Sequence, residues 1–240
     1  MNRRGLGSVD AFLDDHAQAT RGDTHLAPSI GSGADGGGAP RRLMVMRRRG
    51  QILRGALDVF GEKGFAEATV QDLIDASGTS RATFYKYFSD REACVAALSD
   101  AVLAWLEMQA RDAIDISADD WPTQVRAVTE RLVGLLTQDR RVARLCGIEA
   151  MLVSPEVRAR QRVGFDALAE GLRRGRAQSR CDEWLPTKME DFLVAGGVSL
   201  ATRSVFRDLP SDHDLGPRIA QLVLIPYLGA ARASKLVRGI

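Results

Sequence analysis

The sequence predicts an all-α protein. From Arg47 onward, apolar residues recur every three to four positions, which is the period of a helix that buries one face. Pro122, Pro155 and Pro217 fall near the expected starts of helices, where a missing N–H costs little. No segment shows the alternating pattern of Val, Ile, Thr or Tyr between turns that is typical of a strand.

Residues 1–40 are expected to form a disordered N-terminal tail. The segment from Gly31 to Pro40, GSGADGGGAP, has no periodicity and cannot bury enough surface to offset its ordering entropy. Its glycines lack the Lys-Ser/Thr ending of a phosphate loop, so a flexible linker is the better interpretation. Only Val9–Ala19 could form a short, weak helix.

Residues 41–92 are expected to form a domain of three helices. The first has Ile52, Ala56 and Phe60 on one face and ends near Gly61 and Gly64. Two short helices follow, at 70–77 and 80–88. Thr69 caps the first of them and Gly78 ends it.

A longer helix is expected from Ser89 to about Asp115, with Ser89 and Glu92 spaced as a capping box. Further helices are predicted at 121–138, 140–152, 155–180, 187–207 and 215–237. Pro226 should kink the last of these. These later elements place the second domain at residues 93–240.

Two short helices joined by a tight turn containing glycine are typical of a helix-turn-helix. The second helix enters the major groove of DNA, and its N-terminal residues face the base edges. Small and polar side chains stand at that end, and Arg81 could offer a planar fork to guanine. The candidate groove-facing residues are Ser80, Arg81, Ala82 and Thr83, and the candidate phosphate contacts are Tyr85 and Lys86. Phe84 and Phe88 share a face that we assign to the core.

A basic segment precedes the helix-turn-helix. No acidic residue occurs within it until Asp58, so it predicts a basic arm that reaches a DNA groove or backbone, with Arg48 and Arg49 as candidate contacts. The alternative is a solvated run of charge. The arginines concerned are Arg41, Arg42, Arg47, Arg48, Arg49 and Arg54.

Residues 48–95 resemble the DNA-binding domain of the tetracycline-repressor (TetR) family. The resemblance rests on fragments that occur in the order and at the spacing of the family. In chain order they are Ile52-Leu53-x-x-Ala56-Leu57-x-x-Phe60, Gly64-Phe65, Thr69-Val70-x-x-Leu73, Gly78-x-Ser80-x-x-Thr83-Phe84-Tyr85-x-Tyr87-Phe88 and Arg91-Glu92. One departure is Thr79, where the family commonly has an apolar residue.

The resemblance implies a role for each matching residue. Thr69 would cap its helix and bond a phosphate, and Ser80, Arg81 and Thr83 would lie near bases and backbone. Tyr85 and Lys86 would contact phosphates, and Arg91 matches a basic residue at the start of the fourth helix. The implied partner is double-stranded operator DNA.

For residues 93–240 the resemblance implies a domain that binds a small-molecule effector and forms a homodimer. The helices near 187–207 and 215–237 would pair with their counterparts in the partner. Gly196 and Gly197 would allow close approach there, or they mark a local irregularity of the helix.

An effector pocket is expected between the fourth helix and residues 121–180. Glu149 is the polar candidate within it, although pairing with an arginine is the better interpretation of a buried carboxylate. The others fit an ordinary core equally well. The candidate residues are Trp105, Met108, Trp121, Leu145, Glu149 and Phe165.

Composition limits the functional classes to which this protein can belong. A net charge of +2 gives no bulk sign of a nucleic-acid partner, and no uninterrupted apolar stretch predicts a membrane span, so a cytoplasmic protein is expected. Three widely spaced cysteines favour buried core residues over a metal site or a redox sensor. No metal, cofactor or catalytic residue is predicted. A ligand-responsive regulator, usually a repressor in this family, is expected. A small enzyme is not expected, because the sequence has no Gly-x-Ser-x-Gly or His-Glu-x-x-His motif. A protein-interaction module that keeps the helix-turn-helix as a scaffold is the other alternative.

Overall fold

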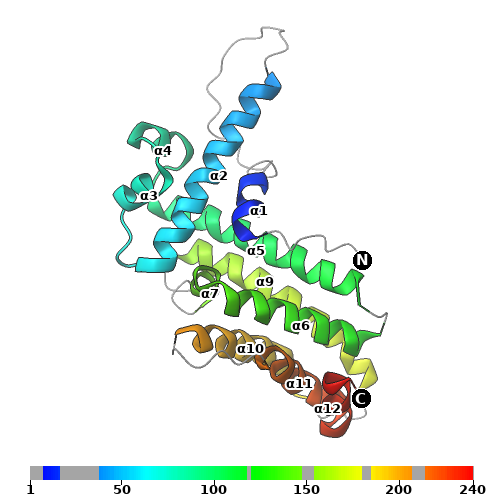
Figure 1. The fold of residues 1–240 in the computed structure, drawn as a ribbon. Helices are drawn as coiled ribbons and strands as arrows, with labels where there is room; N and C mark the ends of the chain where they lie inside the picture. Colours follow the sequence, from blue (N-terminus) through cyan, green and yellow to red (C-terminus); the bar gives the residue numbers. More distant parts are fainter. Residues whose placement is uncertain are drawn as a thin grey trace. The chain divides into compact units, whose positions relative to one another are not determined.

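The computed structural model describes residues 8–16, 38–117, 120–147, 154–179, 185–206 and 214–239, with only the backbone for 15–16, 38–46 and 178. All regular elements in these ranges are helices, which confirms the predicted fold class (Figure 1). The chain divides into two compact units, Met1–Val102 and Leu103–Ile240. The division therefore falls inside a long helix, and not after residue 92 as expected from the sequence.

The first unit contains α1 (Val9–His16), α2 (Gly38–Lys63), α3 (Val70–Ser77), α4 (Arg81–Tyr87) and the first part of α5 (Arg91–Asp115). The helix α2 packs against both α1 and α3. The rings of Phe60 and Phe65 stack with their centroids 5.1 Å apart. The core is made of apolar side chains from all these helices, including the fully buried Ile52, Leu57, Phe60, Leu73, Phe84 and Leu98.

The N-terminal region differs from the expected tail. Val9 and Leu13 of α1 are buried, and α1 packs on α2. The helix α2 begins at Gly38, so the arginines expected in an arm stand on a helix. The short helix that the sequence allowed at Val9–Ala19 is present as α1. Its packing was not predicted, because the apolar side of α1 is too short to form a stable helix without the face of α2 that covers it. The other residues of the expected tail lie outside the described ranges.

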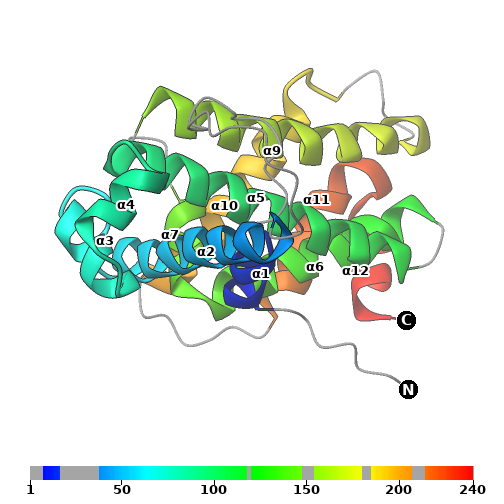
Figure 2. The ribbon, with the colours of Figure 1, turned by 90° about the horizontal axis from the view of Figure 1, so that it is seen from above.

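The second unit contains the end of α5, α6 (Trp121–Gln138), α7 (Arg140–Cys146), α9 (Pro155–Arg173), the 3-10 helix η1 (Arg174–Gln178), α10 (Met189–Phe206), α11 (Leu215–Leu228) and α12 (Ala230–Arg238). The helix α10 contacts α6, α7 and α9, while α11 lies along α6 (Figures 1 and 2). The predicted bounds of α6 are confirmed.

The helix predicted at 215–237 is two helices. Pro226 lies inside α11, and the chain leaves the helix at Gly229, whose φ is 77°. A proline lacks the N–H that would bond the preceding turn, and a glycine adopts positive φ without strain. The break therefore falls three residues after Pro226 and turns α12 away from the line of α11.

The apolar helix α5 and the two described cysteines are all at least partly buried. Among the described helices α5 alone is long and apolar enough to cross a membrane, and 44% of its most apolar window is buried inside the protein. Val95 and Val102 of α5 are buried in the core of the first unit. Burial raises the pKa of the Cys94 and Cys146 thiols to about 12, which suppresses their reactive thiolate form.

Candidate nucleic-acid interface

The first helix of the helix-turn-helix begins with a capping box. The backbone N–H of Asp72 donates to the Thr69 hydroxyl at 3.2 Å, and the backbone N–H of Thr69 donates to the Asp72 carboxylate at 2.9 Å. Lys63 donates to the same carboxylate at 2.6 Å. These contacts confirm that Thr69 caps α3 and leave it exposed on the surface.

The turn between α3 and α4 is built on Gly78 and Ser77. Gly78 has φ 59° and ψ 30°, and its N–H donates to the Asp75 carbonyl at 3.2 Å. Such a left-handed residue ends a helix at little cost only when it has no Cβ. The hydroxyl of Thr79 lies 2.9 Å from that of Ser77, so the residue that departs from the family pattern is hydrogen-bonded within the turn.

The turn is tied to α2 by two residues that sequence reasoning missed. The side-chain amide of Gln51 donates to the Ser77 carbonyl at 2.7 Å. A Cβ on Gly55 would lie 2.7 Å from the Ser77 backbone nitrogen, so α3 approaches α2 as closely as a glycine allows. A glycine inside an otherwise apolar helical stretch was the available signal for this contact.

The second helix, α4, is capped by Ser80, whose hydroxyl accepts from the Thr83 N–H at 3.1 Å. The Ser80 and Thr83 hydroxyls are 2.9 Å apart. Phe84 and Phe88 are buried, as assigned from their spacing. The opposite face of α4 is open to solvent, and we call it the recognition face: Ser80, Arg81, Ala82, Tyr85 and Lys86 are exposed, with Thr83 half-buried beside them.

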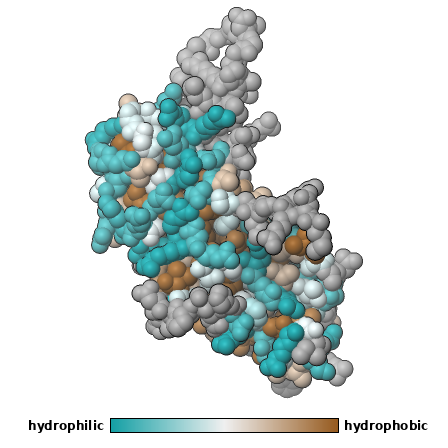
Figure 3. All heavy atoms as spheres, viewed as in Figure 1, coloured by the Kyte–Doolittle hydropathy of each residue, from teal (hydrophilic) through white to brown (hydrophobic). Residues whose placement is uncertain are grey.

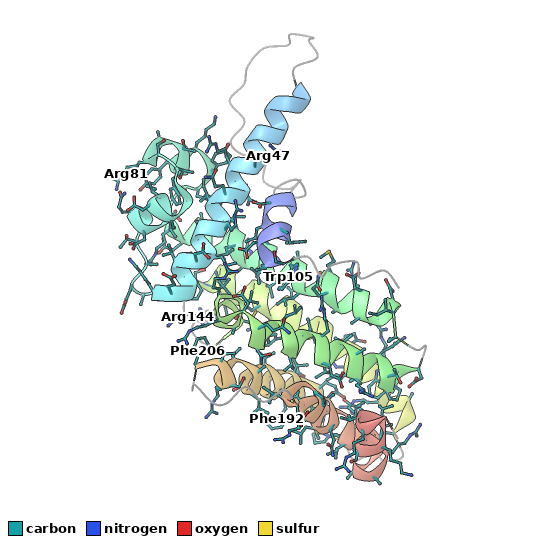
Figure 4. The ribbon with its side chains drawn as sticks, in the orientation of Figure 1. Arg47, Arg81, Trp105, Arg144, Phe192 and Phe206 are labelled. Carbon is teal, nitrogen blue, oxygen red and sulfur yellow. The ribbon has the colours of Figure 1, made fainter. Side chains whose placement is uncertain are left out.

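The recognition face is hydrophilic and partly ordered by α3. Arg81 points outward from α4 (Figure 4) and donates to the Gln71 side chain at 3.4 Å. Gln71 in turn donates to Asp75 at 2.9 Å. The surface over α3 and α4 is mainly hydrophilic on the side shown in Figure 3. Arg81 is thus held over the exposed surface by one long, exposed hydrogen bond that a nucleic acid could replace.

Two of the other basic candidates have partners within the first unit. Arg48 is exposed and donates to the Gln51 side chain at 3.1 Å. The guanidinium of Arg49 lies 5.5 Å from the centre of the Phe88 ring, where it is half-buried. Both residues belong to the helix α2, which carries them next to the helix-turn-helix.

Arg91 has a different setting from the one implied by the resemblance. Its Nη1 donates to the carbonyls of Phe65 and Ala68 at 3.0 and 2.8 Å, and its Nε and Nη2 bind Glu92. The guanidinium therefore fastens the loop between α2 and α3. A phosphate contact by Arg91 would have to share these bonds, so that role stays a prediction.

The predicted capping box of Ser89 and Glu92 is wrong. The carboxylate of Asp90 accepts from the Ala93 N–H at 2.7 Å and so caps α5, while Glu92 pairs with Arg91. Asp is as good a cap as Ser, and the two stand side by side in the sequence. Only the loop geometry decides between them.

The candidate effector residues differ in how far they are buried. Trp105 and Leu145 are buried, Phe165 is half-buried and Met108 is exposed. Trp121 has a packing role, because its N–H donates to the Gly171 carbonyl at 2.9 Å and its ring meets that of Tyr227 edge-on at 5.0 Å. Glu149 lies outside the described residues.

No cluster of three or more metal-ligating side chains occurs among the described residues. The buried polar centre of the second unit is instead an ion pair. Arg176 holds the fully buried carboxylate of Glu190, to which the Tyr227 hydroxyl also donates. Burial acts to raise the pKa of Glu190, but these hydrogen bonds outweigh it and lower that pKa overall.

Comparison with known proteins agrees with this geometry. Residues 52–98 match the family model "Bacterial regulatory proteins, tetR family". The chain is similar to the transcriptional repressor KstR2 of Mycobacterium tuberculosis, with 34% identity over 91 residues, which are 38% of this chain and 42% of that protein. The chain thus matches less than half the length of this relative.

Solved structures resemble the chain over a longer span. The fatty acid degradation regulator FadR from Bacillus halodurans superposes with a TM-score of 0.65 at 21% identity, over 74% of this chain and 94% of that one. FadR from Bacillus subtilis, solved in complex with stearoyl-CoA, gives a TM-score of 0.62 at 20% identity, over 75% and 97%. At these identities the likeness shows a shared fold.

Proposed function

Because the chain belongs to the TetR family of bacterial regulatory proteins, we propose that it is a cytoplasmic, homodimeric transcription regulator that binds double-stranded operator DNA. The recognition face of α4 carries this proposal. It offers polar side chains from the first turns of a helix whose other face is fixed in the core. That is the geometry with which a recognition helix enters a major groove.

Dimerisation is proposed through α10 and α11. Three large apolar side chains on these helices are exposed in the single chain: Phe192, labelled in Figure 4, at 73%, Leu200 at 46% and Leu222 at 53%. Apolar side chains gathered on neighbouring helices favour a contact with another surface. A symmetric pair would present two recognition helices to two half-sites.

We further propose that the regulator is a repressor released by a small apolar ligand. The solved relative bound to stearoyl-CoA supports a ligand that has an apolar chain, although its CoA part is polar and charged. The helix α5 runs from the first unit into the second, so it is the natural element to carry the signal. Release requires only that the ligand favour a dimer whose recognition helices no longer match the half-sites. No cofactor is part of this proposal.

DNA binding is tested with the sequence upstream of the chain's own gene. We expect an inverted repeat with half-sites about 34–36 Å apart, or a near equivalent, and binding that weakens steeply with salt. Fluorescence anisotropy against a scrambled duplex of equal length measures both. Equal affinity for the two duplexes at every salt concentration would contradict the proposal.

Ligand control is tested with stearoyl-CoA as the probe. Its coupling to DNA must be reciprocal, so the operator should weaken its binding by the factor with which it weakens the operator, about 5- to 150-fold. Calorimetric titrations with and without the operator measure the factor. The same affinity in both titrations would exclude release by this ligand.

A further inference from the structure

The helix α1 lies outside the segment that matches the family model, yet it is packed into the first unit (Figure 1). Ser8 caps it by accepting from the Ala11 N–H at 3.2 Å. Val9 and Leu13, four residues apart on this eight-residue helix, are 2% and 0% exposed, so the side of α1 that carries them is covered. An isolated helix of this length is unstable in water, so this packing is what maintains α1.

The surface of α2 that receives α1 is shaped for it. A Cβ on Gly50 would lie 2.6 Å from the Leu13 carbonyl oxygen and 3.3 Å from the Asp14 Cα. Glycine weakens a helix interior, so its place here is explained by the backbone of α1. One turn further along α2, Arg54 pairs with Asp14 at 3.0 Å.

The part of α2 next to this contact is poorly suited to be a helix by itself. The helix continues back to Gly38 and contains Pro40 in its first turn. Arginines stand at 41, 42, 47, 48 and 49, and no acidic residue occurs in α2 before Asp58. Arg41 and Arg42 stand near the N-terminus of α2, where the positive end of the helix dipole opposes cations, and the first turn contains no acidic residue. From α1, Asp14 supplies a carboxylate to α2 through its pair with Arg54.

We propose that α1 is a positioning element for DNA binding: by docking on Gly50 of α2 it keeps the basic N-terminal segment of α2 helical, and so presents its arginines to the DNA backbone. This inference rests on the proposed DNA-binding function. It names Leu13 and Gly50 as the residues that make the contact, and neither needs to touch DNA.

The acidic residues of α1 also act against DNA binding, because they reduce the positive charge of the first unit. Ordering outweighs this effect at physiological salt. Exposed charges more than about 8–10 Å from a phosphate are largely screened. An affinity falls in direct proportion to the fraction of molecules that hold the binding conformation, so a segment that is helical one-tenth of the time binds about tenfold more weakly.

The test compares two variants of the full-length protein that add the same charge to α1. Leu13→Glu places a carboxylate on the buried side, and Ala11→Glu places one on the exposed side. Leu13→Glu should weaken operator binding about tenfold and reduce the slope of log K against log salt by about 0.9 for each phosphate that the arginines no longer neutralise. Ala11→Glu should leave both nearly unchanged.

Gly50→Ala tests the docking from the other side, since it improves the helix propensity of α2 while its Cβ excludes α1. Hydrogen exchange of residues 9–16 should accelerate in Gly50→Ala and Leu13→Glu, with the thermal midpoint monitored in each. Tighter or unchanged operator binding by Leu13→Glu, once exchange shows α1 released, would overturn the inference. Failure of the unmodified protein to bind the operator would instead contradict the proposed function.

Discussion

Arg176 and Glu190 form a two-point ion pair that joins η1 to α10: Nε meets Oε1 at 2.8 Å and Nη2 meets Oε2 at 2.9 Å. Arg176 also donates to the Leu185 and Pro186 carbonyls, and the Tyr227 hydroxyl donates to Glu190 at 3.1 Å. One buried carboxylate therefore links η1, α10 and α11, two of which are the proposed dimer helices.

Glu190→Gln should destabilise the second unit strongly. It removes the carboxylate charge that faces the partly buried Arg176, and breaking a buried pair from one side costs on the order of 3 kcal/mol. Urea unfolding measures the change. The control is Glu107→Gln, which breaks the exposed pair with Arg111 and should change stability by less than about 0.5 kcal/mol. Similar losses in the two variants would show that the buried pair has no special weight.

Acid should loosen the capping box of α3. Hydrogen bonds from Lys63 and then from Thr69 lower the pKa of Asp72 from 3.8 to about 2. A folded-state pKa below the unfolded value contributes stability above about pH 4, and this contribution is lost as the pH falls towards 2. The thermal midpoint of the native protein should therefore fall more between pH 5 and pH 2.5 than that of Asp72→Asn. Parallel pH curves for the two proteins would disprove a role for this carboxylate.

Gly55→Ala should damage the helix-turn-helix although alanine favours helices. Its Cβ would lie 2.7 Å from the Ser77 nitrogen, so α3 must shift, which costs about 1–3 kcal/mol. At Gly134 in α6 the nearest atom is 3.9 Å away, at the end of the Gln138 side chain, and alanine should stabilise by up to about 1 kcal/mol. Calorimetry on both variants distinguishes the two effects by their sign.

Lys86 and Arg81 should affect DNA binding differently. Lys86→Ala should weaken all duplexes alike and lower the salt slope by about 0.9, because phosphate contacts carry no base information. Arg81→Ala should lose about 1–3 kcal/mol at one base pair of the half-site if it reads guanine. Binding to a set of single-base operator variants separates them, and a uniform loss for Arg81→Ala would place it among the phosphate contacts.

Phe192→Asp should dissociate the dimer. Phe192 on α10 and Val163 on α9 are similarly exposed, at 73% and 70%, but only Phe192 lies on the proposed interface. Sedimentation velocity at micromolar concentration should therefore show monomer for Phe192→Asp and an unchanged species for Val163→Asp. A dimer that survives the first substitution, or dissociates after the second, would rule out an interface at α10.

The sequence by itself determined the all-α class, the bounds of α6, and the helix-turn-helix with its Thr69 cap and buried Phe84 and Phe88. These features depend on periodicity and on caps within a few residues of one another, so a linear pattern contains them. The exposure of the candidate residues on α4 was predictable for the same reason, because one short helix carries them all.

Tertiary structure alone decided the docking of α1 at Gly50, the bonds from Arg91 to the Phe65 and Ala68 carbonyls, and the pairing of Arg176 with Glu190. In each case the partner is a backbone atom or a side chain from a different helix or loop, brought close by the packing of whole elements. Local propensity does not specify such a neighbour, since the same glycine, arginine or glutamate would suit a solvated surface equally well until the opposing element is in place.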